Sequence, residues 1–251
     1  MNRLVYGVGL ASSGWDRPLP AGPAGCSTNV LRQDELAAAY SATILPEASP
    51  STAYLLTYAR VIEQLHRRGP FAPMRFGCQL ADEAAIRNLL RARQDDFLTL
   101  LDEIAGCDEF GLRILSGVSE PLPEGVELRQ SCESAFLTAE GAGGRYLSDR
   151  RQWYARRDAR RQLAEAVAEN FRAAFEGLYV RCQSAAAEAG SIASLSFLVR
   201  RKHQPRFHKK FRSLQATCSD KLLLTGPWPA YHFVALSGAE ATPSPAALLG
   251  A

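Results

Sequence analysis

Apolar residues in the first 120 positions alternate between strand-like and helical spacing. The run from Arg3 to Gly9 is β-prone, and Ser51 precedes a segment whose apolar residues recur three or four positions apart until Gly69. Tyr54, Tyr58, Val61 and Leu65 form that apolar face. The pattern predicts a first strand and a helix capped by Ser51, with residues 26–43 ambiguous between strand, helical turn and strand.

A second helical pattern begins at Asp82, which can cap it, and ends at Gly106. Arg93 interrupts its apolar face, where a hydrophobic residue is expected. Short strands are predicted before and after it, over Met74 to Gly77 and Glu109 to Leu115. Alternation of strands and helices indicates an α+β arrangement for this half of the chain.

A long helical stretch opens the second half, from Tyr146 to about Ala189, with aromatic and aliphatic residues on one face and arginines on the other. The pattern allows one extended helix or two helices with a break near 155–158. The elements predicted after it are a strand over Ala193 to Arg200, a basic helix over Gln204 to Thr217, and strands over Lys221 to Thr225 and Tyr231 to Leu236. This order indicates a ferredoxin-like layer.

The predicted fold class is therefore α+β with two domains. An N-terminal α+β domain spans 1–120, and a ferredoxin-like domain with a long helix spans 145–236. The segment 121–144 between them is a variable, turn-rich connection with a short strand over Val126 to Gln130. The Ser, Ala, Pro and Gly-rich tail 237–251 is predicted to be disordered.

Between the last two predicted strands lies a corner built from glycine, proline and aromatic residues. Its structural signature consists of Gly226, Pro227, Trp228, Pro229, Tyr231 and Phe233. Glycine supplies a flexible break, while each proline fixes φ and removes a backbone donor. No carboxylate, thiol or lysine stands beside Tyr231 and His232. The corner is therefore predicted to have a structural role and not a catalytic one.

This corner resembles the "TGPWPPYSFV" ending of the GvpL/GvpF family of gas vesicle proteins, with Ala230 in place of the second proline and His232 in place of serine. The similarity covers roughly residues 3 to 235 in the family's order. The other matching segments are Leu4 to Val8, Ala72 to Gly77, Glu109 to Ile114, Arg145 to Leu147 and Leu195 to Arg200.

The resemblance implies an accessory or minor structural protein of gas vesicles, the air-filled protein organelles that give microbes buoyancy. It further implies binding to the vesicle shell protein, which is small and very apolar, and to other accessory proteins during assembly or nucleation. The expected location is the cytoplasm, in association with gas vesicles. The expected partners are proteins, with no membrane and no nucleic acid.

Composition fits a stable globular protein, since 47% of the 251 residues are hydrophobic. The longest apolar runs are far shorter than the roughly 20 residues of a membrane helix, and the first nine residues do not resemble a secretory signal. Six widely spaced cysteines without a Cys-x-x-Cys pair indicate reduced, mostly buried thiols and not a disulfide framework or a zinc site. Cytosolic residence is therefore predicted.

The net charge of +3 conceals an uneven distribution: residues 1–144 hold 12 Lys/Arg and 18 Asp/Glu, whereas 145–225 hold 17 and 7. This opposition would hold the two halves together or orient copies head to tail. The candidate partner-contact residues are Arg200, Arg201, Lys202, Lys209 and Lys210. The alternative function is a basic α+β nucleic-acid-binding module, although the spacing of Phe207 and Phe211 favours core packing over base stacking.

Motifs for catalysis, cofactors and metals are weak. Gly7-Val8-Gly9 follows a strand, but the residues after it do not open the helix that a dinucleotide site requires. The four histidines lack metal-ligand spacing, and no serine stands in a nucleophile elbow. We therefore expect a protein without catalytic residues, cofactor or metal, and not an enzyme.

Overall fold

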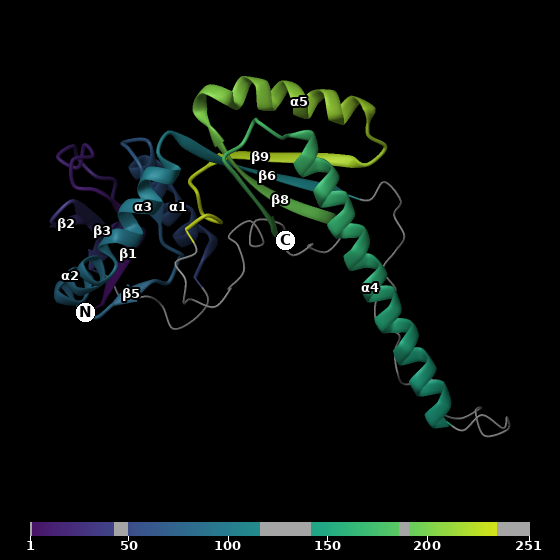
Figure 1. The fold of residues 1–251 in the computed structure, drawn as a ribbon. Coiled ribbons are helices and arrows are strands. Elements are labelled where there is room, and N and C mark those ends of the chain that lie inside the picture. Colours follow the sequence, from purple (N-terminus) through teal and green to yellow (C-terminus); the bar gives the residue numbers. More distant parts are fainter. Residues whose placement is uncertain (1, 43–49, 116–141, 186–190, 235–251) are drawn as a thin grey trace.

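The computed structural model describes residues 2–42, 50–115, 142–185 and 191–234. Figure 1 shows two sheets, with helices on both faces of the first and on one face of the second, and a long helix that projects from the body. This mixture of helices and antiparallel strands confirms the predicted α+β class.

The first sheet has the strand order β2-β3-β1-β4, and β5 also pairs with β1. Its strands are β1 (Arg3–Leu10), β2 (Thr28–Gln33), β3 (Leu36–Ala42), β4 (Phe71–Pro73) and β5 (Gln79–Leu80). All of these pairs are antiparallel. The described part of the ambiguous segment 26–43, up to residue 42, thus forms a hairpin, preceded by the short 3-10 turn η1 (Pro23–Gly25).

Side chains of β1 point alternately to the two faces of this sheet and pack against helices on both. Leu4 and Tyr6 pack with α1 (Thr52–His66), whereas Val5 and Val8 pack with the helices on the opposite face. Residues 5 and 8 share a face because the register with β3 shifts between Val5 and Gly7, which adds one residue to β1. The first sheet is therefore buried on both sides.

Local capping signals fixed the helices of this half as predicted. The Ser51 side chain accepts a hydrogen bond from Tyr54 N, and Asp82 accepts one from Ala85 N. The predicted single helix after Asp82 is wrong, because Arg93 has φ −128° and ψ 28° and divides it into α2 (Glu83–Ala92) and α3 (Gln94–Ile104). Arg93 is the same position that interrupts the apolar face.

The second sheet has the order β7-β8-β6-β9, and all its pairs are antiparallel. Its strands are β6 (Cys107–Leu115), β7 (Arg181–Ala185), β8 (Ser191–Arg200) and β9 (Lys221–Trp228). Its helices are α4 (Ala142–Ala174) and α5 (Gln204–Thr217), and the 3-10 turn η2 (Arg201–His203) precedes α5. The chain order βαββαβ with these pairings is the ferredoxin-like arrangement.

The ferredoxin-like layer begins earlier in the chain than predicted. β6 lies within 1–120, yet it pairs with β8 and β9 and not with the first sheet. Its alternate residues Phe110, Leu112 and Ile114 are fully buried under α4 and α5, which explains this placement. The change from one sheet to the other thus occurs between Ile104 and Cys107, whereas the domain division at 121–144 stays a prediction.

Three further predicted elements differ from the structure. The long helix ends at Ala174 and not near Ala189, because the chain turns at Gly177 (φ +76°) and continues into β7. The last predicted strand ran from Tyr231 to Leu236, and its described part up to Val234 is a turn in which Phe233 N donates to Ala230 O at 3.3 Å. The strand predicted at Met74 is displaced to β4 and β5 on either side of it. The predicted strand at Val126, most of the connection 121–144 and the tail 237–251 lie outside the described residues.

The two sheets share a hydrophobic core. The cluster formed by Ile86 and Leu90 of α2 with Phe97 of α3 also contains Leu198 of β8. Ala230 and Phe233, which follow β9, are buried in the same cluster. The α2 and α3 side of the first sheet is therefore packed against parts of the second sheet.

Candidate interaction surface

Helix α5 lies on the outside of the second sheet and carries the basic side chains that the sequence indicated (Figure 1). No Asp or Glu occurs between Ser191 and Ser219. Arg206, Lys209 and Arg212 are exposed on α5, and Lys202 is exposed in η2. We call these four residues the basic ridge. Of the five predicted contact residues, Arg200 ends β8, Arg201 and Lys202 lie in η2, and Lys209 and Lys210 lie in the middle of α5. Lys210 is half-buried, whereas the other four are exposed.

The opposite face of α5 is part of the core. Phe207 is fully buried and Phe211 is nearly so. The Phe207 ring stacks on Phe175, which directly follows α4, with ring centroids 4.5 Å apart, and also contacts Phe110 and Phe197. The prediction that these phenylalanines pack in the core is confirmed, and they are not available to stack on nucleic-acid bases.

Asp108 anchors the start of α5 through a cluster of polar contacts. Its carboxylate accepts hydrogen bonds from Gln204 Nε2 at 2.6 Å and from the Arg201 guanidinium at 3.1–3.2 Å, and His66 Nε2 lies 2.7 Å away. Burial alone would raise the pKa of Asp108, but the hydrogen bonds from His66, Arg201 and Gln204 together hold it far below its usual range. We call these four residues the Asp108 cluster.

The Asp108 cluster changes the interpretation of Arg201. His66 ends α1 under the first sheet, Asp108 lies on β6 and Arg201 follows β8, so the cluster ties α5 to both sheets. The Arg201 guanidinium is only half exposed and is oriented by Asp108. It therefore supports the start of α5, while Lys202 and Lys209 are exposed to solvent.

In the proline-rich corner, Gly226 has φ +116°, and a Cβ built there would lie 2.6 Å from Glu109 O. Only glycine fits this approach of β9 to β6. Trp228 is 40% exposed, whereas Ala230 and Phe233 are buried. The corner is thus held by Gly226 and by the residues after Pro229, and not by a buried indole.

Glu109 and His232 form the polar fastening of this corner. Glu109 is 3% exposed, and its carboxylate accepts a hydrogen bond from His232 N at 2.9 Å and contacts His232 Nδ1. The hydrogen bond to Glu109 raises the pKa of His232, and burial opposes that shift only in part. His232 is thereby favoured in its charged form beside a buried carboxylate.

Among the side chains of α4 whose burial the structure describes, those packed in the core lie near its C-terminal end. Its 33 residues make a rod about 50 Å long at 1.5 Å per residue, and Figure 1 shows most of it projecting from the body. Ala168, Phe171 and Phe175 are buried against the second sheet, whereas Trp153 and Leu163 are more than half exposed. The Trp153 ring is covered by the Arg157 guanidinium at 5.5 Å, a cation–π contact.

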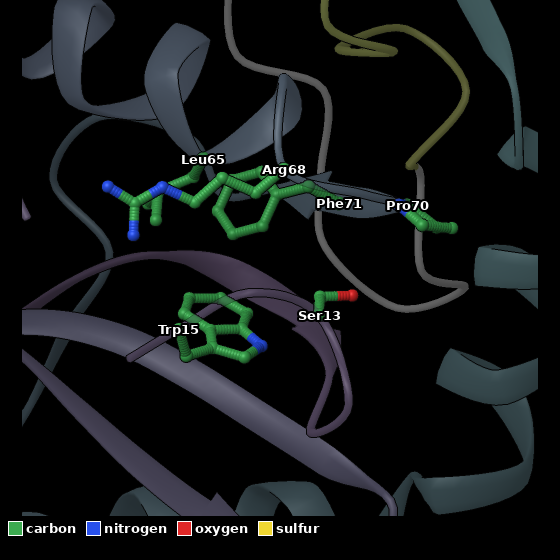
Figure 2. A pocket seen from close by; sticks show the side chains of 6 residues that line it. All are labelled: Ser13, Trp15, Leu65, Arg68, Pro70 and Phe71. Carbon is green, nitrogen blue, oxygen red and sulfur yellow. The ribbon is translucent and has the colours of Figure 1, made fainter. Parts of the chain in front are cut away.

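One apolar cleft in the first half is shown in Figure 2. It is lined by Ser13, Trp15, Leu65, Arg68, Pro70 and Phe71. The space between these side chains does not admit a water-sized sphere, so the cleft is packing between the loop after β1 and the end of α1. Gly9, whose segment resembles the start of a dinucleotide fingerprint but lacks the helix that such a site requires, lies here too, because a Cβ would be 2.8 Å from the Trp15 ring.

Histidine, cysteine and acidic side chains are the candidates for metal binding and thiol chemistry. No group of three or more such residues in the described ranges is arranged to hold a metal ion. Cys26, Cys78, Cys107, Cys182 and Cys218 form no disulfide, and Cys132 lies outside the described residues. The expectation that the thiols are mostly buried is wrong for these five, because Cys107 is buried and the other four are half-buried. Burial raises the pKa of the Cys78, Cys107 and Cys182 thiols, which makes them less reactive. No helix in the described ranges is long and apolar enough to cross a membrane.

The family model for the gas vesicle synthesis protein GvpL/GvpF matches residues 2–235. The chain belongs to the GvpL/GvpF family. The resemblance inferred from the sequence motifs is thereby confirmed, and the protein is related to gas vesicles. The match covers both sheets and ends just after the proline-rich corner.

Individual relatives agree with this assignment. Gas vesicle protein L of Streptomyces sp. (strain CB03234) is 27% identical over 175 residues, which cover 66% of this chain and 62% of that protein, so the match spans less than two thirds of the relative. The crystal structure of GvpF from Anabaena sp. PCC7120 has a TM-score of 0.70 at 15% identity, covering 96% of this chain and 99% of that one. The crystal structure of GvpF from Microcystis aeruginosa has a TM-score of 0.65 at 17% identity, covering 94% of this chain and 99% of that one. These structures share the fold.

The sequence pattern reveals the basic residues of α5 but not the contacts that position them. It assigns no role to Asp108 and Glu109, although two adjacent carboxylates at the start of a buried strand are a signal that each needs a partner. Their partners lie 42 to 123 residues away, so spacing along the chain does not reveal them.

Proposed function

We propose that this protein is an assembly factor or minor structural component of gas vesicles that binds the shell subunit and other accessory proteins in the cytoplasm. Membership of the GvpL/GvpF family over residues 2–235 is the observation that carries the proposal. The exposed surfaces support it, because the basic ridge and the projecting part of α4 offer side chains to partners and not to a small molecule.

We also propose that the protein does not catalyse a reaction. The Asp108 carboxyl group has a strongly lowered pKa, and it contacts His66, Arg201 and Gln204, which hold α5 in place. The contact between His232 and Glu109 holds the corner after β9 in place. Both groups of residues are thus engaged in support of the fold. Turnover of a small metabolite by the pure protein, abolished by one substitution in either group, would contradict this part of the proposal.

Binding to the shell subunit is the direct test. The tagged protein is incubated with the untagged shell subunit from the same gas vesicle gene cluster, and an unrelated α+β protein with the same tag serves as control. Retention of the subunit well above the control is expected. Equal retention by both proteins would refute shell binding. Probing washed, floating vesicles for the protein then separates a permanent component from an assembly factor.

The nucleic-acid alternative makes a different prediction. Backbone binding by the basic ridge would show association with DNA or RNA that weakens steeply as salt rises, since phosphate contacts release counterions. We expect no shift of a labelled duplex or single strand at about 150 mM salt, near the physiological range. The buried positions of Phe207 and Phe211 are the reason, because they remove base stacking from this surface.

A further inference from the structure

The projecting part of α4 is a long stretch of helix whose described side chains are exposed. Trp153 and Leu163 are more than half exposed, and Tyr154 and the arginines beside it are exposed too. Figure 1 shows this part of α4 extending away from the second sheet. Since helices in proteins gain most of their stability by packing one face against a neighbour, an exposed stretch with large apolar side chains indicates a partner.

One face of the projecting part continues the face that packs in the core. Trp153 precedes the buried Phe171 by 18 residues, which is about five turns of helix, so the two side chains lie on the same line along α4. Arg150 and Arg157 flank Trp153 on that face at spacings of three and four residues. The exposed face therefore has an aromatic centre between two cations.

The charge of the projecting part favours an acidic partner. Residues 145–161 contain seven arginines and two aspartates, and they contain no lysine or glutamate. Two α4 helices side by side would bring like charges together, which is unfavourable. Pairing of α4 with α4 of another copy is therefore disfavoured.

Helix α3 has the opposite charge. Its 11 residues include four acidic residues and no lysine or arginine. Glu103 already pairs with Arg181 of the second sheet at 2.9 Å. Asp95 and Asp102 are exposed, and in the described part of the chain neither makes an ion pair. These two carboxylates are available to cations from outside the molecule.

The charges on the two helices have the same spacing. Arg150 and Arg157 are seven residues apart, and so are Asp95 and Asp102. At 1.5 Å per residue, each pair spans about 10.5 Å along one face of its helix. The two helices can therefore lie side by side with both arginines close to an aspartate.

We propose that the projecting face of α4 docks on α3 of a second copy of this chain, so that copies associate head to tail. The contact joins Arg150, Trp153 and Arg157 of one copy to Asp95 and Asp102 of the next. Because the two sides of the contact are different surfaces, the outer copies keep one free surface each and further copies can add. The uneven charge of the two halves of the chain then serves contacts between copies, whatever other partners the protein binds.

Self-association of the pure, full-length protein is the first test. Its sedimentation coefficient should rise with protein concentration at about 0.1 M salt, where the Debye length is about 10 Å. The rise should be much smaller at about 1 M salt, where the Debye length is about 3 Å. A monomer at every concentration would refute the inference. Association that is equally strong at both salt concentrations would refute it as well.

Charge reversal identifies the two surfaces. One variant combines Arg150→Glu with Arg157→Glu, and a second variant combines Asp95→Lys with Asp102→Lys. In either variant alone, like charges face each other across the proposed contact, so self-association should weaken about tenfold or more. Both variants keep exposed, helix-compatible side chains, and each should retain the circular dichroism spectrum of the unmodified protein.

A matched control separates these surfaces from a general effect of net charge. Arg17 follows β1 and Arg60 lies on α1, and both are exposed. The variant that combines Arg17→Glu with Arg60→Glu changes the net charge by the same amount as the α4 variant. It should associate like the unmodified protein. An equal loss in this control would show that net charge, and not the α4 face, determines association.

A mixture of the two reversed variants tests the head-to-tail arrangement itself. The α3 variant still carries the basic α4 face, and the α4 variant still carries the acidic α3 face. The mixture should therefore associate, although neither variant associates well alone, and a misfolded variant would not restore association in this way. If the mixture stays monomeric, the pairing of α4 with α3 is refuted. Loss of association in the α4 variant alone would place its arginines on another surface and refute the α3 site.

Discussion

Glu109 is a buried carboxylate whose hydrogen bond raises the pKa of its neighbour His232. Because the folded-state pKa of His232 is raised above the value of about 6.5 in an unfolded chain, the folded protein binds a proton that the unfolded chain releases. Its contribution to stability is complete below about pH 6.5. The contribution is lost as the pH rises through the folded-state pKa.

The pH dependence of His232 can be measured directly. Urea unfolding of the unmodified protein and of His232→Gln is compared from about pH 6 to about pH 9, the window that begins near the unfolded pKa. The difference in the free energy of unfolding should shrink as the pH rises. A constant difference would show that His232 is equally protonated in both states. Glu109→Gln, which removes the carboxylate, should flatten the same profile.

Gly226 carries a second prediction at the scale of the residue. At φ +116°, and with Glu109 O only 2.6 Å from where a Cβ would lie, an alanine is both strained and in collision with backbone. Gly226→Ala should therefore destabilise the fold by more than about 1 kcal/mol, measured by urea unfolding. Gly14→Ala is the control, because no atom lies within 4 Å of its Cβ position. A loss at Gly226 no greater than at Gly14 would contradict the close approach.

At the scale of the element, α4 combines a packed end with a solvated end. Phe175 is fully buried against Phe197 and Phe207, whereas Trp153 is 57% exposed. Phe175→Ala should lower the free energy of unfolding by about 3–5 kcal/mol, the usual loss for a large core residue. Trp153→Ala should change it by less than about 0.5 kcal/mol, as at surface sites. A large loss at Trp153, measured by urea unfolding, would mean that the projecting end packs in solution.

Elements with strong local signals were predicted from the sequence. Ser51, Asp82 and Gly106 marked helix ends by capping, and these ends are where the structure has them. β7 was missed because its residues are mostly polar and become a strand only by pairing with β8. The β-prone residues after Pro229 form a turn, since burying Ala230 and Phe233 in the shared core outweighs their strand propensity.

The candidate surface could be predicted only in part, because some of its residues are positioned by contacts that are distant along the chain. Basic residues of α5 are evident from composition, and their helical spacing shows which side faces outward. The Asp108 cluster joins residues from α1, β6 and α5, so it depends on the topology of two sheets.

At the scale of the whole molecule, the two sheets share a hydrophobic core and form one structural unit. Leu198, Ala230 and Phe233 from the second half are buried among residues of α2 and α3, and His66 reaches Asp108 across the same boundary. Removing either half would expose this apolar surface and leave Asp108 without a partner from α1. The halves should therefore unfold together in one cooperative transition.

Tryptophan fluorescence can test this cooperativity, because Trp15 lies in the core of the first sheet and is 7% exposed. In a Trp153→Phe, Trp228→Phe variant, Trp15 reports the first half alone, while circular dichroism reports all helices. The two urea transitions should coincide, as in a two-state protein. Phe233→Ala should shift both midpoints equally, since its ring is buried in the shared core. Separate midpoints would show two independently stable halves, and the contact between them would then be weaker than its burial indicates.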